Sequence, residues 1–290
     1  MPPADLPRLP SRRSNTSKYD YGRVVVVGGA AGMAGAPALS SMAALRSGAG
    51  LVEAIVPEQV VAIAASFDPC VMVRGLADRA DGTFASDALE EIESRARHAD
   101  AVAVGPGLGR SDAVVQIVSH LWQHLPQPVI FDADALWALA SIDRGTLARH
   151  AGPRMLTPHA GEMLRLLGVG RSSALAGDRA VLEREAATLA EAIDAVIVLK
   201  GPATLIVDRT QRAHNDTGNP GMATAGTGDV LTGVTAALVA QRLSPFDAAR
   251  LAAWVHGRAG DLAAESLGEI SMTARDLLDR LHVAFREVLG

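Results

Sequence analysis

The sequence has few aromatic residues, almost no cysteine and no excess of positive charge. Only 3% of its 290 residues are aromatic whereas 49% are hydrophobic, so small aliphatic side chains must form most of the core. Such a core suits parallel strands that pack closely against helices. The single cysteine, Cys70, excludes an internal disulfide and a metal site with several cysteine ligands. Cys70 begins the apolar run 70–73, which predicts a buried side chain.

Charge and hydropathy exclude two further classes of protein. The net charge is −5 and lysine and arginine do not cluster, which argues against a nucleic-acid-binding surface. No apolar run reaches the length of a membrane-spanning helix, and the first residues, MPPADLPRLP, lack the apolar core of a secretion signal. We therefore expect a cytoplasmic protein that binds neither nucleic acids nor membranes.

The chain divides into a short arm and one domain. Residues 1–20 are rich in proline, arginine and serine, which predicts a flexible N-terminal arm ahead of a domain at 21–290. Short β-branched runs predict strands at 23–27, 51–56, 101–104, 128–131, 154–157 and 195–199, and a hairpin at 205–214. Helical patterns follow most of them, as at 35–47 and 178–194, and end the chain at 245–264 and 273–289. This alternation predicts an α/β/α fold with a mainly parallel sheet.

The strongest functional signal is the stretch NDTGNPGMATAGTGDVLTG at 215–233. Its turn Ala225, Gly226, Thr227 and Gly228 leads into an apolar helix. A glycine-rich turn at the start of a helix presents unpaired N–H groups at the positive end of the helix dipole, which is a site for an anion. Asp229 follows in the first turn, where its charge would repel that anion. Two explanations remain open, a general base for a hydroxyl that attacks a phosphoryl group and a helix cap.

Two other glycine loops follow predicted strands. GGAAG at 28–32 lies in a βαβ pattern, but the GxGxxG fingerprint of dinucleotide-binding folds fails at Ala30 and Met33. GPGLG at 105–109 either lets the backbone approach a ligand closely or makes an ordinary turn before a helix that Ser111 or Asp112 caps.

Charged residues gather where predicted strands end. Asp132 and Asp134 follow one strand, at the edge where open α/β sheets bind ligands, although Asp134 suits the cap of a helix at 135–140 as well. His159 and Glu162 have the spacing of a capping box, or of a water-mediated contact to Mg²⁺. Lys200 ends an apolar strand beside glycine and proline, where a cation is suited to neutralise phosphate.

Taken in order, five segments resemble the ADP-dependent NAD(P)H-hydrate dehydratases of the ribokinase-like superfamily. These segments are GGAAGMAGAPALSSMAALRSGAGLV at 28–52, GPGLG at 105–109, LTPHAGEMLRLLG at 156–168, LKGPAT at 199–204 and NPGMATAGTGDVLTG at 219–233. The resemblance spans about residues 18–290. It implies a ribokinase-like three-layer α/β/α sandwich with a mainly parallel central sheet.

The resemblance also implies two sub-sites and a reaction. One sub-site would bind ADP, the co-substrate, through Lys200, Gly201, Pro202, Ala203, Thr204 and Gly228. The other would bind the hydrated NADH or NADPH through Ala36, Gly107, Gly109, His159 and Asp229. Asp229 would be the catalytic base, the turn 225–228 would bind phosphate, and Glu162 would orient Mg²⁺ through water. ADP would phosphorylate the hydroxyl of the (S)-hydrate, and elimination of phosphate would restore NADH or NADPH.

The resemblance further implies a homo-oligomer, for which a tetramer is the leading form, and a separate NAD(P)H-hydrate epimerase as functional partner. Ala30 and Met33 depart from the serine and aromatic residue that many members of the family have in the first loop. One alternative is a ribokinase-like kinase of a vitamin alcohol, which the GPGLG and TPHAGE segments disfavour. The other is a nucleotide-binding protein without catalysis, which has no need of both Lys200 and Asp229.

Overall fold

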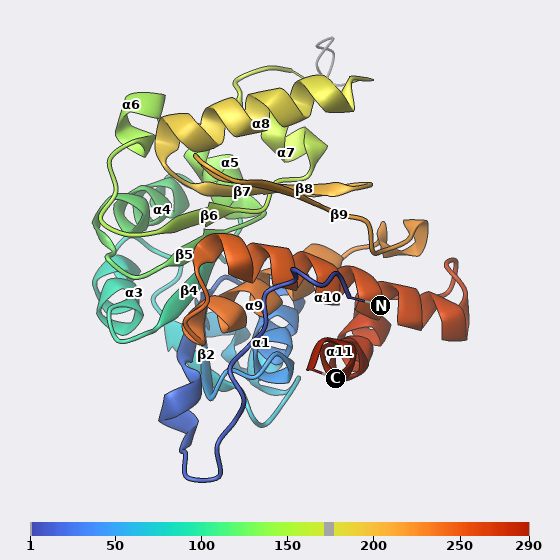
Figure 1. Cartoon of the computed structure of the whole chain (residues 1–290). Helices are drawn as coiled ribbons and strands as arrows, with labels where there is room; N and C mark the ends of the chain where they lie inside the picture. The colour runs from blue at the N-terminus through green and yellow to red at the C-terminus, as the bar shows by residue number, and fades with distance from the viewer. Residues whose placement is uncertain (1, 171–176, 290) are drawn as a thin grey trace.

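Nine strands form one sheet within residues 2–170 and 177–289, the part of the chain that the computed structural model describes (Figure 1). The strands are β1 (Arg23–Val27), β2 (Leu51–Pro57), β3 (Met72–Leu76), β4 (Ala101–Val104), β5 (Val129–Phe131), β6 (Arg154–Leu156), β7 (Val196–Leu199), β8 (Thr204–Val207) and β9 (Arg212–Asn215). Their order across the sheet is β3-β2-β1-β4-β5-β6-β7-β8-β9. Neighbours from β3 to β7 are parallel, and the pairs β7–β8 and β8–β9 are antiparallel.

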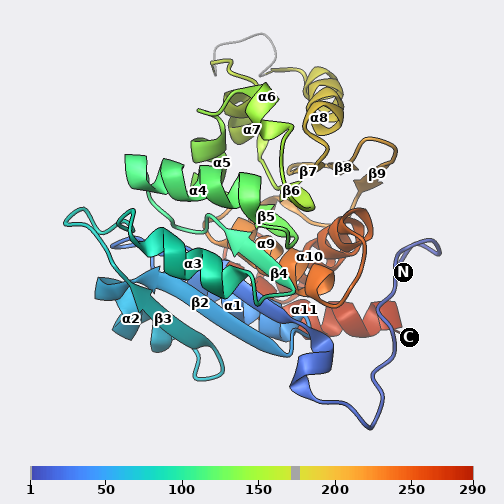
Figure 2. The ribbon, with the colours of Figure 1, turned by 90° about the vertical axis from the view of Figure 1, so that its left-hand side faces the viewer.

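Helices cover both faces of this sheet, as Figures 1 and 2 show. The first face carries α1 (Gly35–Arg46), α9 (Thr227–Ala240), α10 (Pro245–Leu267) and α11 (Ala274–Leu289). The second face carries α3 (Ala88–Ala96), α4 (Asp112–His124), α5 (Asp134–Leu139), α6 (Arg144–Leu147), α7 (Ala160–Leu166) and α8 (Arg179–Ile193). The short α2 (Val61–Ala65) packs beside β2 and β3. This arrangement confirms the predicted three-layer α/β/α fold.

The two cores follow from the alternation of side chains along the strands. In β1, Val24 and Val26 belong to the core under α1, α9, α10 and α11, whereas Val25 and Val27 belong to the opposite core. Successive residues of a strand point to opposite faces, so a continuous valine run serves both cores at once. The valines of β1 are fully buried for this reason.

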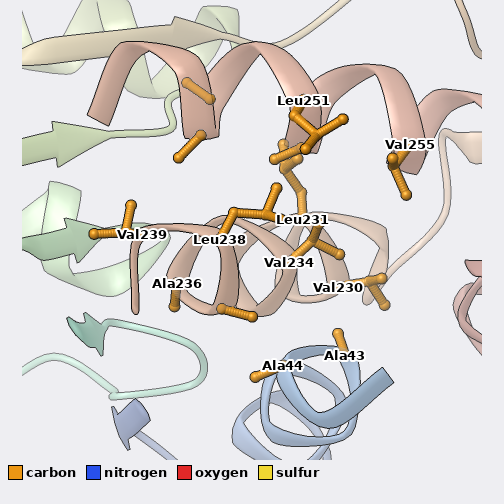
Figure 3. Close-up of a cluster of buried hydrophobic side chains, with 14 of the residues drawn as sticks. Ala43, Ala44, Val230, Leu231, Val234, Ala236, Leu238, Val239, Leu251 and Val255 are labelled. Carbon is orange, nitrogen blue, oxygen red and sulfur yellow. The ribbon is translucent and has the colours of Figure 1, made fainter. Parts of the chain in front are cut away.

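Close packing of α1, α9 and α10 fixes the start of α9. In Figure 3, Ala43 and Ala44 of α1 face α9, and Leu251 of α10 lies on its other side. Gly233 of α9 approaches the backbone of Ser40 so closely that a Cβ at this position would collide with it. The Ser40 hydroxyl donates a hydrogen bond to the carbonyl of Asp229, 2.8 Å away, which ties the first turn of α9 to α1.

The predicted strands are confirmed with ends that differ by at most one residue, and the helix at 35–47 ends at Arg46. The edge strand β3 and the helix α3 were not predicted. β3 contains arginine and glycine and its burial is only partial, so its sequence lacks the apolar run of an inner strand. The predicted burial of Cys70 is wrong, because the residue is exposed in the turn that precedes β3.

Within the predicted arm at 1–20, residues 2–17 contain no helix or strand and residues 18–20 belong to the 3₁₀ helix Lys18–Tyr21, and the arm contacts the domain at several points. Leu6 is buried in the core of α9, α10 and α11. Asp5 pairs with Arg250 at 2.6 Å, and the Arg12 guanidinium donates a hydrogen bond to the carbonyl of Gly48. The flexibility of this arm remains a prediction.

None of the described helices is long and apolar enough to cross a membrane.

The strand order reverses direction at β1. From β1 the chain runs outward to β2 and β3 and then returns to β4 on the other side of β1. The loops that leave the carboxyl ends of β1 and β4 therefore diverge and open a crevice, the usual ligand site of an open α/β sheet. Residues 28–34 and 105–111 form these two loops.

Candidate active site

The turn before α9 presents a row of backbone N–H groups without acceptors. Within the described part of the chain, no oxygen accepts a hydrogen bond from the N–H groups of residues 224–229. Thr227 Oγ1 lies 2.9 Å from the carbonyl oxygen of Met222 and 3.0 Å from that of Thr224, which holds the turn closed. These N–H groups stand at the positive end of a 14-residue helix. The geometry is that of an anion site.

Glycine is required at two places in this turn for different reasons. Gly226 precedes the helix with a φ of 91°, in the left-handed region that glycine adopts without strain. Gly228 lies inside the helix, and a Cβ there would be 3.3 Å from Lys200 Nζ. The positive φ therefore belongs to Gly226, whereas Gly228 keeps the approach to Lys200 open.

The Asp229 carboxylate does not cap its helix. Gly226 occupies the N-cap position and no side chain makes a cap hydrogen bond there. Among the described residues, none donates a hydrogen bond or forms an ion pair with the Asp229 carboxylate. Burial raises the pKa of Asp229 to about 7, the charge of Asp132 adds to the rise, and Lys200 opposes it. An unpaired carboxylate with this pKa is suited to accept a proton near neutral pH.

Lys200 lies in a cluster of carboxylates beneath the start of α9. Its ammonium is 2.8 Å from Asp132 Oδ1 and 3.8 Å from Glu162 Oε2. The second oxygen of Asp132 accepts a hydrogen bond from the Thr232 hydroxyl at 2.7 Å. Burial by itself would lower the pKa of Lys200, but Asp132 and Glu162 raise it above its usual value. The ammonium therefore stays charged, and part of its charge is compensated before any phosphate binds.

The Asp132 carboxylate is ionised although the residue is only 1% exposed. Burial favours its neutral form, but the charge of Lys200 and the hydrogen bonds from Lys200 and Thr232 lower its pKa below the usual value. The sequence places Asp132 at a strand end and indicates no specific role for it. Its partner Lys200 is 68 residues away along the chain, so no local sequence pattern predicts this ion pair.

His159 and Glu162 form the capping box of α7. His159 Nδ1 accepts hydrogen bonds from the N–H groups of Gly161 and Glu162, and Glu162 Oε2 accepts one from the N–H of His159. Lys200 N–H donates to the carbonyl of Pro158, which brings this helix start beside Lys200. Burial raises the pKa of Glu162, and the charge of Lys200 opposes the rise. Glu162 therefore serves as a cap and lies against the carboxylate cluster.

A cleft of about 920 Å³ opens beside this cluster. Its lining contains all predicted nucleotide-binding residues, which are Lys200, Gly201, Pro202, Ala203, Thr204 and Gly228, as well as His159. Residues 201–203 form the turn between β7 and β8, and Arg179 holds it by donating hydrogen bonds to the carbonyls of Leu199 and Lys200. A cleft of this size suits a nucleotide.

His256 of α10 also lines the cleft and was not predicted. Its Nε2–H donates a hydrogen bond to the carbonyl of Thr227 at 2.8 Å, in the turn before α9. Burial lowers the pKa of His256 to about 4, so the imidazole is neutral. A lone histidine inside an apolar helical pattern gives no signal of such a position in the sequence.

Three of the remaining predicted substrate residues lie outside α9, with Ala36 at the start of α1 and Gly107 and Gly109 in the loop after β4. The loops after β1 and β4 are joined by hydrogen bonds from Gly29 N–H to the carbonyl of Pro106 and from Ala30 N–H to that of Gly107. Gly107 and Gly109 are buried there, and Met33 packs over Gly107 together with Ala36. Of the described residues that line the cleft, none is Ala36, Gly107, Gly109 or Asp229. The predicted substrate-binding residues are thus divided, because His159 lines the cleft with the predicted nucleotide-binding residues, whereas Ala36, Gly107, Gly109 and Asp229 do not.

Asp134 holds the second loop in place. Its Oδ2 accepts a hydrogen bond from the N–H of Gly109, and its Oδ1 pairs with Arg110, both at 3.0 Å. Asp134 is therefore no cap of α5, whose N-cap residue is Ala133. The charge of Asp134 contributes to the raised pKa of Asp229, which places Asp229 within electrostatic range of this loop.

The described side chains contain no group of three or more histidine, cysteine, aspartate or glutamate residues placed to hold a metal ion. A magnesium ion in this cleft would take most of its ligands from nucleotide phosphates and water, which is usual for Mg²⁺ at nucleotide sites. Glu162 lies 3.8 Å from the ammonium of Lys200, which lines the cleft.

Comparison with known proteins gives one family. Residues 24–282 match the family described as NAD(P)H-hydrate dehydratase. The chain is 44% identical over 282 residues to the bifunctional NAD(P)H-hydrate repair enzyme of Moorella thermoacetica. This match covers 97% of this chain and 52% of that relative. The corresponding enzyme of Escherichia coli K12 is 36% identical over 275 residues, 94% of this chain and 49% of the relative. The chain spans about half the length of the curated relatives it matches.

Solved structures agree with this match. The ADP/ATP-dependent NAD(P)H-hydrate dehydratase of Bacillus subtilis, co-crystallized with ATP and Mg²⁺, is 30% identical with a TM-score of 0.79. The similarity covers 96% of this chain and 94% of that one. A hydroxyethylthiazole kinase from Pyrococcus horikoshii is 17% identical with a TM-score of 0.60, over 90% of this chain and 87% of that one, which indicates a shared fold alone.

Proposed function

Because the chain belongs to the NAD(P)H-hydrate dehydratase family, we propose that it converts hydrated NADH or NADPH back to the reduced cofactor with the help of an adenine nucleotide. The observation that carries the proposal is the Asp229 carboxylate. It is half-buried and without a hydrogen-bond partner in the described structure, and it belongs to the last residue of the row 224–229 whose N–H groups lack acceptors. A base beside an anion site is the arrangement that phosphorylation of a hydroxyl requires.

In the first step, Asp229 accepts the proton of the hydrate hydroxyl, and the oxygen of this hydroxyl attacks the terminal phosphorus of the nucleotide. The bond from this phosphorus to the bridging oxygen breaks, so ADP leaves as AMP, or ATP as ADP. The free N–H groups of the turn stabilise the charge that develops on the phosphoryl oxygens. In the second step, phosphate leaves the ring carbon and a proton leaves the neighbouring carbon, which restores the double bond of the reduced nicotinamide.

The nucleotide would lie in the cleft with its phosphates toward Lys200 and Gly228. Lys200 would neutralise phosphate charge, and its ion pair with Asp132 directs its ammonium toward the start of α9. When bound with the nucleotide, Mg²⁺ would neutralise further phosphate charge, with Glu162 as its contact through water. The hydrated dinucleotide would lie beyond Asp229, against Ala36, Gly107, Gly109 and His159.

The finer parts of the proposal concern the donor and the partners. ADP is proposed as the phosphoryl donor from the family resemblance, and the Bacillus subtilis dehydratase is named ADP/ATP-dependent. An NAD(P)H-hydrate epimerase is proposed as functional partner, in keeping with the name bifunctional that the longer relatives carry. A homo-oligomer, in particular a tetramer, is proposed as the state in solution, which light scattering after size exclusion measures.

Incubation with chemically hydrated NADH, Mg²⁺ and either ADP or ATP tests the proposed function. We expect the absorbance of reduced nicotinamide to recover, with one AMP formed per NADH when ADP is the donor. A parallel reaction offers hydroxyethylthiazole and pyridoxal in place of the hydrate. Phosphorylation of either alcohol, with no recovery of NADH under any nucleotide, would contradict the proposal and favour a vitamin-alcohol kinase.

A further inference from the structure

One wall of the nucleotide cleft is a loop with little regular structure of its own. All residues from 215 to 224 except Gly221 line the cleft, and the short 3₁₀ turn Pro220–Met222 is the regular element between β9 and α9. Much of this loop is exposed. A segment of this kind has low local stability unless side chains hold it.

A single carboxylate on α10 holds two consecutive residues of this loop. Asp261 Oδ2 accepts a hydrogen bond from the N–H of Gly218, and Asp261 Oδ1 accepts one from Asn219 Nδ2, both at 3.1 Å. Asn219 Oδ1 in turn accepts a hydrogen bond from the N–H of Gly221, which closes the 3₁₀ turn. The contact therefore fixes both the position of the loop and its internal fold.

The surrounding surface of α10 is shaped for the same loop. The Thr217 hydroxyl lies 3.0 Å from the carbonyl oxygen of Trp254. A Cβ at Gly257 would collide with Thr217, and a Cβ at Gly260 would collide with Met222. Two glycines thus let the loop lie directly on the helix, and Asp261 follows immediately after the second.

We propose that Asp261 is a positioning residue of the nucleotide cleft, whose carboxylate holds loop 215–224 in the conformation that receives an adenine nucleotide. The inference rests on the proposed function in one respect, namely that a nucleotide binds in this cleft. Asp261 acts through the loop and is not among the residues that line the cleft.

The physical consequence is a change in affinity. Without the two hydrogen bonds, the loop samples conformations in which the wall of the cleft is not formed. The apparent affinity for the nucleotide then falls in proportion to the fraction of molecules whose loop is in the binding conformation. We expect Asp261→Ala to raise the Kd and KM for ADP about tenfold, because two hydrogen bonds to one carboxylate are lost. The kcat at saturating ADP should change less than twofold, since Ser40 of α1 still holds the carbonyl of Asp229 and His256 of α10 still holds that of Thr227.

Isothermal titration calorimetry with ADP and Mg²⁺, steady-state kinetics and hydrogen exchange of residues 215–224 test the proposal together. Asn219→Ala, which removes one of the two hydrogen bonds and the cap of the 3₁₀ turn, should reproduce the loss of affinity. The double variant should be little weaker than either single one, because both changes break the same contact. Asp261→Asn, which retains an acceptor oxygen, should recover part of the affinity.

The matched control is Asp247→Asn, on the same helix, where the carboxylate bonds to Ser244 at the far end from the cleft. We expect this control to lower stability slightly without changing ADP affinity. Unchanged ADP affinity in folded Asp261→Ala or Asn219→Ala would overturn the proposal, as would loss of stability with no faster exchange in the loop. If the unaltered protein binds neither ADP nor ATP, the proposed function fails first and this inference fails with it.

Discussion

At the scale of single residues, the proposed mechanism depends on Asp229. Asp229→Asn keeps the size of the side chain but removes the base, and a positioned base contributes about 10²–10⁴-fold in rate. We expect turnover to fall by that factor while ADP binds as tightly as before or more tightly, because charge repulsion next to the phosphates is removed. Turnover assays and calorimetry on the same preparation provide the measurement. Near-normal turnover in the folded variant would exclude Asp229 as the base.

The stability of the same variant supplies an internal control. The pKa of Asp229 rises from 3.8 to about 7 on folding, so the folded state holds a proton that the unfolded state releases between these pH values. This contribution to stability is complete below pH 3.8 and is lost as the pH rises to 7. Asp229→Asn should therefore be more stable than the unaltered protein above pH 7, on the order of 1–3 kcal/mol. A variant that is less stable at pH 8 would contradict a raised pKa of Asp229 in the folded protein.

The pH dependence of the reaction follows from the same pKa. Asp229 accepts a proton only when it is ionised, so kcat/KM should fall about tenfold per pH unit below a pH of about 7 and level off above it. Initial rates with a constant-ionic-strength buffer series measure this profile. A profile that stays flat down to pH 5 would show that the group titrating near 7 takes no part in turnover.

Lys200 has a structural role besides the predicted contact with phosphate. Lys200→Met leaves the Asp132 carboxylate buried without a counter-ion, which typically costs about 3–5 kcal/mol of unfolding free energy. The double variant Lys200→Met/Asp132→Asn should regain most of this stability but not nucleotide affinity. Denaturant unfolding and calorimetry separate the two effects. Equal stabilities of the single and double variants would mean that an unpaired Asp132 carboxylate does not destabilise the folded protein.

At the scale of the element, the start of α9 requires open space as well as a particular backbone shape. Gly228→Val would place methyl groups against Lys200 and over the free N–H groups, so we expect loss of ADP binding and turnover. Thr227→Ser keeps the hydroxyl that closes the turn and should retain most activity. Equal activities of the two folded variants would refute a phosphate-binding turn.

Gly226 tests the backbone shape of the same element. Gly226→Ala combines a positive φ with a Cβ that would lie 2.8 Å from a methyl carbon of Leu39, so it should cost more stability than φ strain alone. Gly268→Ala is the matched control, because Gly268 has a φ of 76° and no heavy atom would lie within 4 Å of its Cβ. We expect thermal unfolding to show a loss of about 1 kcal/mol in the control and a larger loss in Gly226→Ala. The reverse order would contradict close packing of this turn on α1.

At the scale of the whole molecule, the arm and the candidate active site lie at opposite ends of α1 and α9. The arm contacts Gly48, after the end of α1, and Arg250 in the first half of α10, whereas the turn 225–228 is at the start of α9. A 14-residue helix such as α9 is about 20 Å long, so the arm is remote from the chemistry. Removal of residues 2–15 should lower the unfolding free energy by about 1–3 kcal/mol, because Leu6 is no longer buried, and leave kcat unchanged. Loss of kcat in the folded truncated protein would contradict this separation.

The sequence by itself determined all strands except β3, the layered fold, the family and the glycine-rich turn at 225–228 before the helix α9. Valine runs, glycine turns and helix starts are local patterns, because backbone preference and side-chain alternation act over a few residues. These local patterns did not predict the edge strand β3, because an edge strand is only partly buried and needs no apolar run. The burial of Cys70 was predicted wrongly for a related reason, because a local apolar run does not reveal whether another element covers it.

Only the tertiary structure decided how the site residues act on one another. Asp132 meets Lys200 from 68 residues away and Thr232 from 100 residues away, and α10 brings Asp261 and His256 to the loop and turn before α9. The sequence left open whether Asp229 is a base or a helix cap. The structure favours a base, because Asp229 makes no cap hydrogen bond and desolvation raises its pKa. Burial and electrostatic interaction depend on distance in space, and segments far apart in the chain set that distance only when they pack together.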